Sequence, residues 1–431
     1  MADAPTHPNR TSWTGWTPAH GLPLPRPMGS EADPRVGFVL RLGHALHTSG
    51  YSADRLEEAL SAASDQLGIH GQFFSTPTSI MASFGPQDDQ RTFLLRVEPG
   101  ESNLGKLASV DEVTREVLNG RLTPAEGTSQ LDAIERRPPT YNRWLTTIAF
   151  GVASGSAARF LGGGLNECLA GLAIGLVIGL LALFTSRVHG LNRVFEPVAA
   201  LTASMLAALL AVLGFKVSVF LATLAGVIVL IPGLMLTTAM TELSTRHLAS
   251  GTARFMGAVV LLLGIAFGIA LGTKLVGVTL GDVRSTAPVA LPEWTLLVSL
   301  VLTPLSFVVL LRAAPRDAGW IVLAGALSFT GARLGAMVLG PELGTFGGAF
   351  ATGFASNWYA RFTNRPSQIT LVPGLLLLVP GSVGLRSLAS LLDNDVVLGV
   401  EGAFRMVLIA VSLVSGILIA QVVSPRRKLL A

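Results

Sequence analysis

The sequence has a single cysteine and few charged residues. One thiol, Cys168, cannot form a disulfide within the chain or supply the several thiolates of a structural zinc site. Only 13% of the residues are charged, whereas an ordinary soluble domain has about 25%. Half of the residues are hydrophobic, and the mean hydropathy is +0.57. This composition indicates a membrane protein.

A strong basic excess and the common catalytic motifs are also missing. The net charge is only +4 and is spread along the chain, which argues against a nucleic-acid partner. G-x-S-x-G, P-loop and G-x-G-x-x-G motifs are not present. His44, His47 and His70 lack the spacing and the partners of a metal site. We therefore expect no metal, no cofactor and no enzymatic activity.

The chain divides into a tail, a soluble region and a membrane region. Residues 1–33 contain six prolines and few apolar residues, which predicts a disordered tail and not a cleavable signal peptide. Residues 34–139 have the charge density of a cytoplasmic α+β domain. Their pattern predicts helices over 36–49, 52–68, 104–119 and 123–136, and strands over 71–84 and 90–97. Ser52 is the predicted cap of the second helix.

The membrane region contains ten segments with close to the ~20 apolar residues that cross a bilayer. They are residues 144–162, 166–185, 197–214, 217–240, 254–274, 293–312, 319–339, 344–361, 369–389 and 402–423. Five lie within residues 140–274 and five within 293–431, on either side of an extracytoplasmic linker at 275–292. Because five is odd, the second half must enter from the opposite side. The expected fold is an α-helical polytopic membrane protein with two inverted five-helix repeats.

The loop charges give the expected orientation. With the soluble domain in the cytoplasm, the inner loops and span ends carry 14 Arg or Lys residues and the outer ones carry seven. This difference has the direction of the positive-inside rule. We therefore expect both termini in the cytoplasm.

One short motif occurs twice. Leu-Ile-Pro-Gly at residues 230–233 returns as Leu-Val-Pro-Gly at residues 378–381, a shift of 148 residues that also pairs Gly251 with Gly399. Proline removes a backbone donor and clashes with the preceding turn, so each copy interrupts its apolar segment. Matching interruptions in two halves of a membrane chain are typical of a transporter's binding site. The alternative is a kink that serves packing alone.

An opened helix offers the groups that a small zwitterion needs. Its free amides and the N-terminus of the following half-helix favour a carboxylate, its free carbonyls accept from an ammonium, and hydroxyls can line the wall. The candidate substrate-binding residues lie at or just after the breaks, with one asparagine from a neighbouring span: Pro232, Gly233, Thr237, Thr238, Pro373, Gly374, Pro380, Gly381, Ser382 and Asn357.

Charged residues near the spans are candidates for proton coupling or ion pairing, because a charge at the bilayer centre costs at least ~2.5–3.5 kcal/mol. Glu242 follows the first break by about two and a half turns and is the expected proton-coupling carboxylate. The alternative is a headgroup-level pair with Arg246 at i,i+4. Arg254 is either a snorkelling anchor or part of a close-packed face. For Glu167, near a helix start, we expect a surface role favoured by the helix dipole.

Several segments together resemble a known family. LRLGHALHTSGYSADRLEEALSAASDQLGI, followed by TPTSIMASF, resembles the N-terminal signature of the threonine/serine exporter family. FLGGGLNECLAG and IPGLMLTTAMTELSTRHLASGTAR resemble its first membrane half, and RPSQITLVPGLLLLVPG resembles its second. The resemblance implies a ten-span exporter of L-threonine and L-serine in a bacterial inner membrane, driven by the proton potential.

The resemblance also assigns family motifs to positions in this chain. Arg55 and Glu57 match the Arg-Val-Glu motif of the soluble domain, and Asn166 stands where an aspartate is expected. The first membrane half matches at Pro232, Gly233, Glu242, Gly251 and Arg254, and the second at Pro373, Pro380 and Gly381.

Two other functions stay open at this point. Split-chain relatives are associated with succinate export, so a dicarboxylate exporter is one alternative. A membrane enzyme with a catalytic soluble domain is the other. The implied partners are a small amino acid, protons and the lipid bilayer, and the sequence leaves open whether the chain forms a homo-oligomer.

Overall fold

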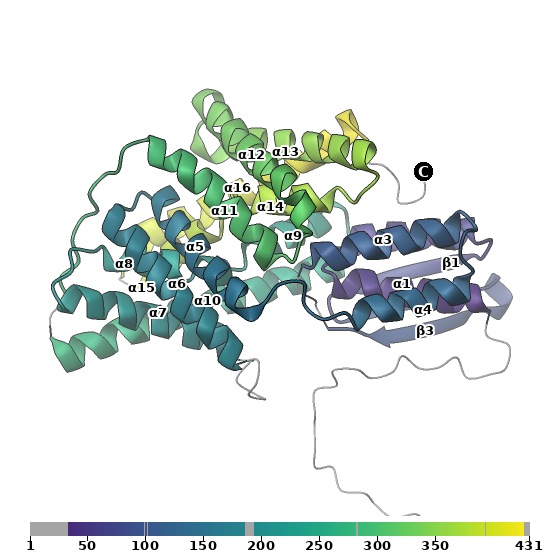
Figure 1. Cartoon of the computed structure of the whole chain (residues 1–431), viewed down its shortest axis with the longest axis horizontal. Coiled ribbons are helices and arrows are strands. Elements are labelled where there is room, and N and C mark those ends of the chain that lie inside the picture. The colour runs from purple at the N-terminus through teal and green to yellow at the C-terminus, as the bar shows by residue number, and fades with distance from the viewer. Residues whose placement is uncertain are drawn as a thin grey trace, which may run out of the picture.

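The computed structural model describes residues 33–98, 100, 102–185, 194–281, 283–392 and 394–425. The tail predicted at residues 1–33 therefore lies outside the described residues, except for Asp33. The described chain is mainly helical and has two regions, an N-terminal α+β unit and a bundle of apolar helices. The α+β unit stands beside the bundle, close to α9 and α14 (Figure 1).

The N-terminal α+β unit has the predicted helices within a few residues. Its elements are α1 (Pro34–Thr48), α2 (Ala53–Gln66), β1 (Gly71–Thr76), β2 (Ser79–Phe84), η1 (Gln87–Asp89), β3 (Arg91–Arg96), α3 (Leu104–Leu118) and α4 (Pro124–Glu135). Gly50 ends α1 with φ +90°, as a glycine after a helix can. Thr123 and Glu126 form a capping box at the start of α4. The antiparallel sheet has the order β1-β2-β3.

The prediction of a single strand over residues 71–84 is wrong. Thr76 pairs with Ser79, so Pro77 and Thr78 form the two-residue turn of a hairpin between β1 and β2. The Thr76 hydroxyl stabilises this turn by accepting from the Ser79 amide at 3.1 Å. Proline presets the backbone of a turn and lacks the donor of a continuing strand. Local turn chemistry therefore divides a segment whose composition favours strand throughout.

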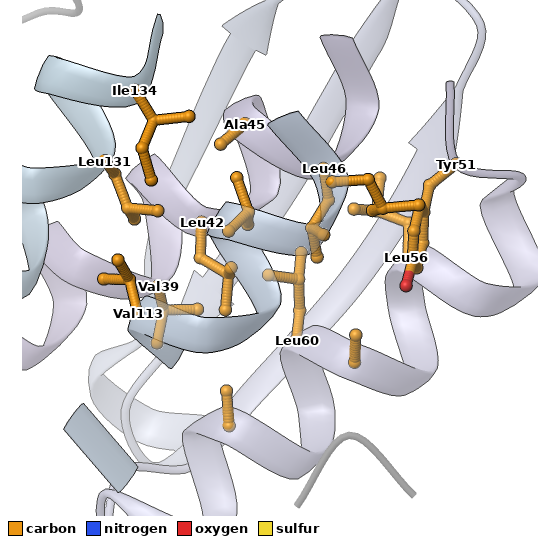
Figure 2. Packing of buried hydrophobic residues seen from close by; sticks show 14 of the residues in the cluster. Val39, Leu42, Ala45, Leu46, Tyr51, Leu56, Leu60, Val113, Leu131 and Ile134 are labelled. Atoms are coloured by element: carbon orange, nitrogen blue, oxygen red, sulfur yellow. The ribbon is translucent and has the colours of Figure 1, made fainter. Parts of the chain in front are cut away.

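The core of the α+β unit lies between α1, α2 and the sheet, with α3 and α4 closing it. Leu42 and Leu46 of α1 are fully buried. Figure 2 shows Leu42 between Leu60 of α2 and Ile134 of α4, and Leu46 on the side of Tyr51 and Leu56. The same apolar cluster continues into the bundle through Val308, Ala313 and Ile321. The two regions therefore share hydrophobic contacts.

The bundle contains the remaining helices. They are α5 (Arg143–Phe160), α6 (Leu165–Thr185), α7 (Phe195–Val212), α8 (Val219–Gly226), η3 (Ile228–Leu230), α9 (Gly233–Ser244), α10 (Leu248–Leu280), α11 (Trp294–Leu310), η4 (Pro315–Asp317), α12 (Ala318–Leu339), α13 (Pro341–Thr363), α14 (Gln368–Leu376), α15 (Gly381–Leu392) and α16 (Val396–Val423). Among the described residues, six segments are long and apolar enough to cross a membrane, or seven if α8 and α9, bent by 49°, form one span. The chain is a polytopic membrane protein.

Helix α10 is longer than the predicted span. It continues to Leu280 and ends at Gly281, which has φ +97°. The first six residues of the predicted linker 275–292 are therefore helical. Those residues are mostly apolar and contain no proline, and the helix ends only at Gly281.

The α+β unit joins the bundle by an end-to-end helix contact. The amides of Leu104 and Gly105, at the start of α3, donate to the carbonyls of Leu311 (3.0 Å) and Arg312 (3.1 Å), at the end of α11. Free amides at one helix start thus satisfy free carbonyls at another helix end. A β-carbon added at Gly105 would lie only 2.6 Å from the Arg312 carbonyl oxygen, so this close approach requires glycine.

Candidate functional site

The two Pro-Gly breaks lie against each other within the bundle. A β-carbon added to Gly233 would overlap the side chain of Val379. One added to Gly381 would overlap the side chain of Ile231 and lie 3.4 Å from the Gly233 Cα. Each glycine is thus packed by the residue that precedes the proline of the other break. Segments 148 residues apart in sequence therefore meet at one point.

The half-helices that follow the breaks have the same form. Helices α9 and α15 begin 148 residues apart and have 12 residues each. Each ends in a turn with a non-glycine residue in the left-handed region, Arg246 with φ 68° and Asn394 with φ 64°. The next helices begin at Leu248 and Val396, again 148 apart. Glycines at equivalent positions then pack on equivalent leucines, Gly251 on Leu243 and Gly399 on Leu391.

Pro373-Gly374 does not interrupt its helix, which corrects the prediction of an opened backbone there. Helix α14 continues through both residues to Leu376, and the break lies just before Pro380. The Gly374 carbonyl accepts a hydrogen bond from the Ser328 hydroxyl of α12 at 2.7 Å. A buried carbonyl near a helix end requires such a donor. The Ser328 hydroxyl therefore satisfies a carbonyl that would otherwise lack a hydrogen-bond donor.

Glu242 is the centre of a buried polar network. Its side chain is 0% exposed. Its Oε1 accepts from the Ala53 amide at 2.8 Å, and its Oε2 accepts from the Ser250 hydroxyl at 2.9 Å. Arg254 Nε lies 3.0 and 3.1 Å from the two oxygens. The alternative pair with Arg246 is wrong, because that residue turns the chain away from α9 and Arg254 of α10 takes the partner's place.

The α+β unit contributes to this network through the turn between α1 and α2. Ala53 is the first residue of α2, and the Ser52 side chain makes no capping hydrogen bond. Ser52 therefore stands at the predicted N-cap position but does not cap the helix through its side chain. Glu242, 189 residues after Ala53, caps the helix instead. Arg254 Nη2 also donates to the Tyr51 carbonyl at 3.5 Å. The carboxylate and its arginine thus hold the two regions together.

A second carboxylate lies at the same interface. Glu57 of α2 is half-buried, and its Oε2 lies 3.3 Å from Nε2 of His247, the residue before α10. Its Oε1 accepts from the Ser75 amide at 2.6 Å. Burial raises the pKa of the Glu57 carboxyl, against the opposing effects of the Ser75 amide and His247. Glu57 and Glu242, the two acidic residues that match the family motifs, therefore both lie where the α+β unit contacts the bundle.

Sequence reasoning missed Ser250 and His247 as members of this network. Ser250 and Arg254 stand at i,i+4 and so lie on one face of α10. That spacing is the signal that could have placed the serine beside the arginine. Nothing in the sequence near His247 points to Glu57, because the two lie 190 residues apart.

A small cavity of about 80 Å³ lies beside the network, between α9, α14 and the α+β unit. None of the predicted Pro-Gly site residues, at 232–233, 373–374 and 380–381, is among its described lining residues. Thr237, Thr238 and Thr241 of α9 form one wall, and Arg55 of α2 lies on another. The Thr237 and Thr241 hydroxyls donate to carbonyls one turn earlier in α9, so their lone pairs can still accept. Within the described chain, Arg55 has no carboxylate partner. Residues 49–52 close the cavity on the side of the unit.

Glu167 has a structural position away from this cavity. It is 1% exposed, so the predicted surface role is wrong. Its Oε2 accepts from the Gly164 amide and its Oε1 from the Ser218 amide, both at 2.8 Å. These amides precede α6 and α8, so one carboxylate caps the starts of two helices.

Asn357 and Ser382 are also separate from the cavity. Asn357 is buried in α13, and its amide donates to the Ser424 carbonyl beyond the end of α16 at 2.6 Å. Ser382 is the second residue of α15, close to the second break. Neither is among the described residues that line the cavity.

Comparison with known proteins adds the family and its relatives. The chain is 26% identical to an uncharacterized protein of Schizosaccharomyces pombe over 81% of its own length and 44% of the relative's. It is 26% identical to pheromone-regulated membrane protein 10 of Pichia sorbitophila, over 85% of this chain and 38% of the relative. The chain thus spans less than half the length of these relatives. No solved structure matches.

Two family models together cover nearly all of the described chain. The ThrE model of threonine/serine exporters matches residues 37–276. The model described as "Threonine/Serine exporter, ThrE" matches residues 296–423. The first ends and the second begins on either side of the segment between α10 and α11. The chain therefore belongs to the threonine/serine exporter family.

Proposed function

We propose that this chain is a proton-coupled secondary transporter that exports small amino acids, L-threonine and L-serine, by alternating access around the two broken helices. The reciprocal contact of Gly233 and Gly381 with the preceding residues of the other break carries this proposal. Transporters built from inverted repeats bind substrate where discontinuous helices of the two halves meet.

The helix boundaries support the proposed fold. Each of the ten predicted segments overlaps one helix of the bundle, or helices on either side of a break. The shared 148-residue shift of the breaks, the half-helices and their turns supports two repeats, 140–274 and 293–431. With five spans each, these repeats are inverted. The α+β unit, residues 34–139, is then a cytoplasmic domain, and the cell membrane of a bacterium is the proposed location.

The cavity between α9 and the α+β unit has groups that suit one amino acid. The Arg55 guanidinium can bind a carboxylate, and threonine hydroxyls and carbonyls can accept from an ammonium. A dicarboxylate would need a second cation. Arg254 is paired with Glu242, and Arg386 lies over the Phe220 ring, with its centroid at 5.9 Å. One available arginine therefore favours a monocarboxylate over succinate.

Glu242 is the proposed proton site. As a carboxylate it holds the Ala53 amide, the Ser250 hydroxyl and Arg254. A proton on Glu242 removes the charge that these donors share, so uptake of a proton weakens the contact between the α+β unit and α9. The unit would then leave the cavity and open it to the cytoplasm. Family membership favours this transport role over the alternative of a catalytic soluble domain.

Counterflow of radiolabelled L-threonine in proteoliposomes tests the proposal. We expect saturable exchange that L-serine inhibits and succinate does not. Arg55→Gln should raise the KM for threonine about tenfold or more, since a charged hydrogen bond is lost. Arg91→Gln, an exposed change on β3, is the matched control. Succinate exchange without threonine exchange would move the chain to the dicarboxylate alternative, and an unchanged KM in Arg55→Gln would remove Arg55 from the site.

A further inference from the structure

A larger cavity, of about 680 Å³, lies elsewhere at the junction of the α+β unit and the bundle. Its walls come from α3, the segment between α4 and α5, the loop between α11 and α12, and the end of α13. It shares no lining residue with the cavity beside Glu242. Cationic side chains dominate the described lining: Lys106, Arg115, Arg137, Arg312, Arg316 and Arg365, against Glu112 and Asp317.

The acidic residues do not neutralise this excess. Asp317 is buried and accepts from the Tyr359 hydroxyl at 3.2 Å and from Arg365, with which it forms an ion pair. In the described part of the chain, neither Arg137 nor Arg316 forms an ion pair with a carboxylate. Arg137 has one long contact, from its Nη1 to the Ser109 hydroxyl at 3.4 Å. Two guanidinium groups therefore stand at the cavity without a counter-ion.

Partial neutralisation of the other cations leaves the cavity basic. Arg115 pairs with Asp111 on α3 at 3.1 Å, and Lys106 Nζ donates to the Glu135 carbonyl at 2.9 Å. Burial lowers the pKa of the Lys106 ammonium, against the opposing effect of Glu135. The remaining acid, Glu112, is exposed. The walls thus offer more donors for an anion than the protein itself satisfies.

Two exposed tryptophans lie at helix starts beside the cavity. Trp320, near the start of α12, lies on its wall and is 43% exposed. At the start of α5, just after the lining residue Thr140, the Arg143 guanidinium lies over the exposed Trp144 ring, 5.8 Å from its centroid. Exposed tryptophans at helix starts are typical of the headgroup layer. Phosphates of lipid headgroups lie at the same depth.

We propose that this cavity binds a phosphate-bearing anion, the headgroup of an anionic phospholipid or a soluble phosphate compound, between Arg137 and Arg316. Arginine matches phosphate oxygens through its planar fork of donors. Arg137 belongs to the segment that leaves the α+β unit, and Arg316 belongs to the bundle. An anion between them bridges the two regions and holds the unit in place.

Binding to the purified full chain tests the proposal. Retention of phosphatidylglycerol against phosphatidylcholine is measured by native mass spectrometry, and pyrophosphate binding by calorimetry in detergent. We expect the double variant R137Q/R316Q to bind one of these anions about 25-fold more weakly, because each arginine near an anionic group contributes about fivefold. The charge-preserving R137K/R316K should keep most of the binding. R91Q/R96Q, which removes two exposed charges from β3, is the control.

Each outcome decides the question. Loss of phosphatidylglycerol in R137Q/R316Q alone identifies a lipid headgroup, and loss of pyrophosphate binding identifies a soluble phosphate compound. The proposed site would be overturned if R137Q/R316Q retained both probes as well as R91Q/R96Q does. It would also be overturned if the native chain retained phosphatidylcholine as well as phosphatidylglycerol. Threonine counterflow is also measured in the same variants. If the anion site proves wrong, the cavity beside Glu242 and its proposed transport role are unaffected.

Discussion

Glutamine in place of Glu242 keeps the shape of the side chain but removes the charge that faces Arg254. In the native network that charge is fully buried, and the Arg254 side chain is only 13% exposed. One amide oxygen can still accept from the Ala53 amide. The new amide N–H groups, however, face the guanidinium, which is itself only a donor.

The expected cost follows from these contacts. Removing one partner of a buried ion pair costs about 3–5 kcal/mol, because the other charge is left uncompensated. Since the hydrogen bond to Ala53 can persist, we expect the lower end, about 3 kcal/mol. That value shifts the equilibrium between the docked and undocked α+β unit by about 150-fold. Glu401→Gln breaks a pair whose carboxylate is 55% exposed, so it should cost less than about 1 kcal/mol.

Hydrogen exchange at the Ala53 amide measures this effect directly. In the native chain that amide donates to Glu242, so it should exchange slowly. In Glu242→Gln its protection should fall by about 100-fold, while Glu401→Gln should leave it unchanged. The same variant should lose the proton dependence of threonine export in proteoliposomes.

A double variant separates charge from packing. Glu242→Leu with Arg254→Met replaces the pair by apolar side chains of similar size, and such replacements are often neutral for stability. We expect near-native stability without proton-driven transport. If Glu242→Gln retained native protection at Ala53 and a native pH dependence of export, the buried pair would not hold the unit and Glu242 would not be the proton site.

Two further predictions concern packing and pH. Gly233→Ala should impair threonine counterflow more than membrane insertion, because its β-carbon overlaps Val379, and overpacking costs about 1–3 kcal/mol. Gly277→Ala, whose β-carbon has no atom within 4 Å, is the control, and equal transport by both variants would contradict the contact between the breaks. Burial lowers the pKa of His47 to about 4 from 6.5. Its stabilising contribution, about 3 kcal/mol, is therefore complete above pH 6.5 and is lost as the pH falls to about 4. Unfolding of His47→Gln compared with the native chain across this range measures it, and equal pH dependence in the two would refute it.

The sequence by itself determined where the helices lie and where they break. Apolar length and proline position act locally, so the break at Pro232 and the end of α1 at Gly50 depend on residues within one or two turns. The 148-residue shift between the two motifs could also be found in the sequence, because it is a comparison of residue types that does not depend on packing. The hairpin turn at Pro77 shows the limit of local reading, since composition alone joined β1 and β2.

Only the tertiary structure decided which of these local features meet. The contact between the two breaks and the cap that Glu242 supplies to α2 join residues 148 and 189 positions apart. Helical spacing predicted Arg246 as the partner of Glu242. The chain turns at Arg246 in the left-handed conformation, so this pair does not form, and the packing of α10 places Arg254 beside Glu242 instead. A buried carboxylate takes whichever donors the packed elements bring within reach, and chain spacing does not specify them.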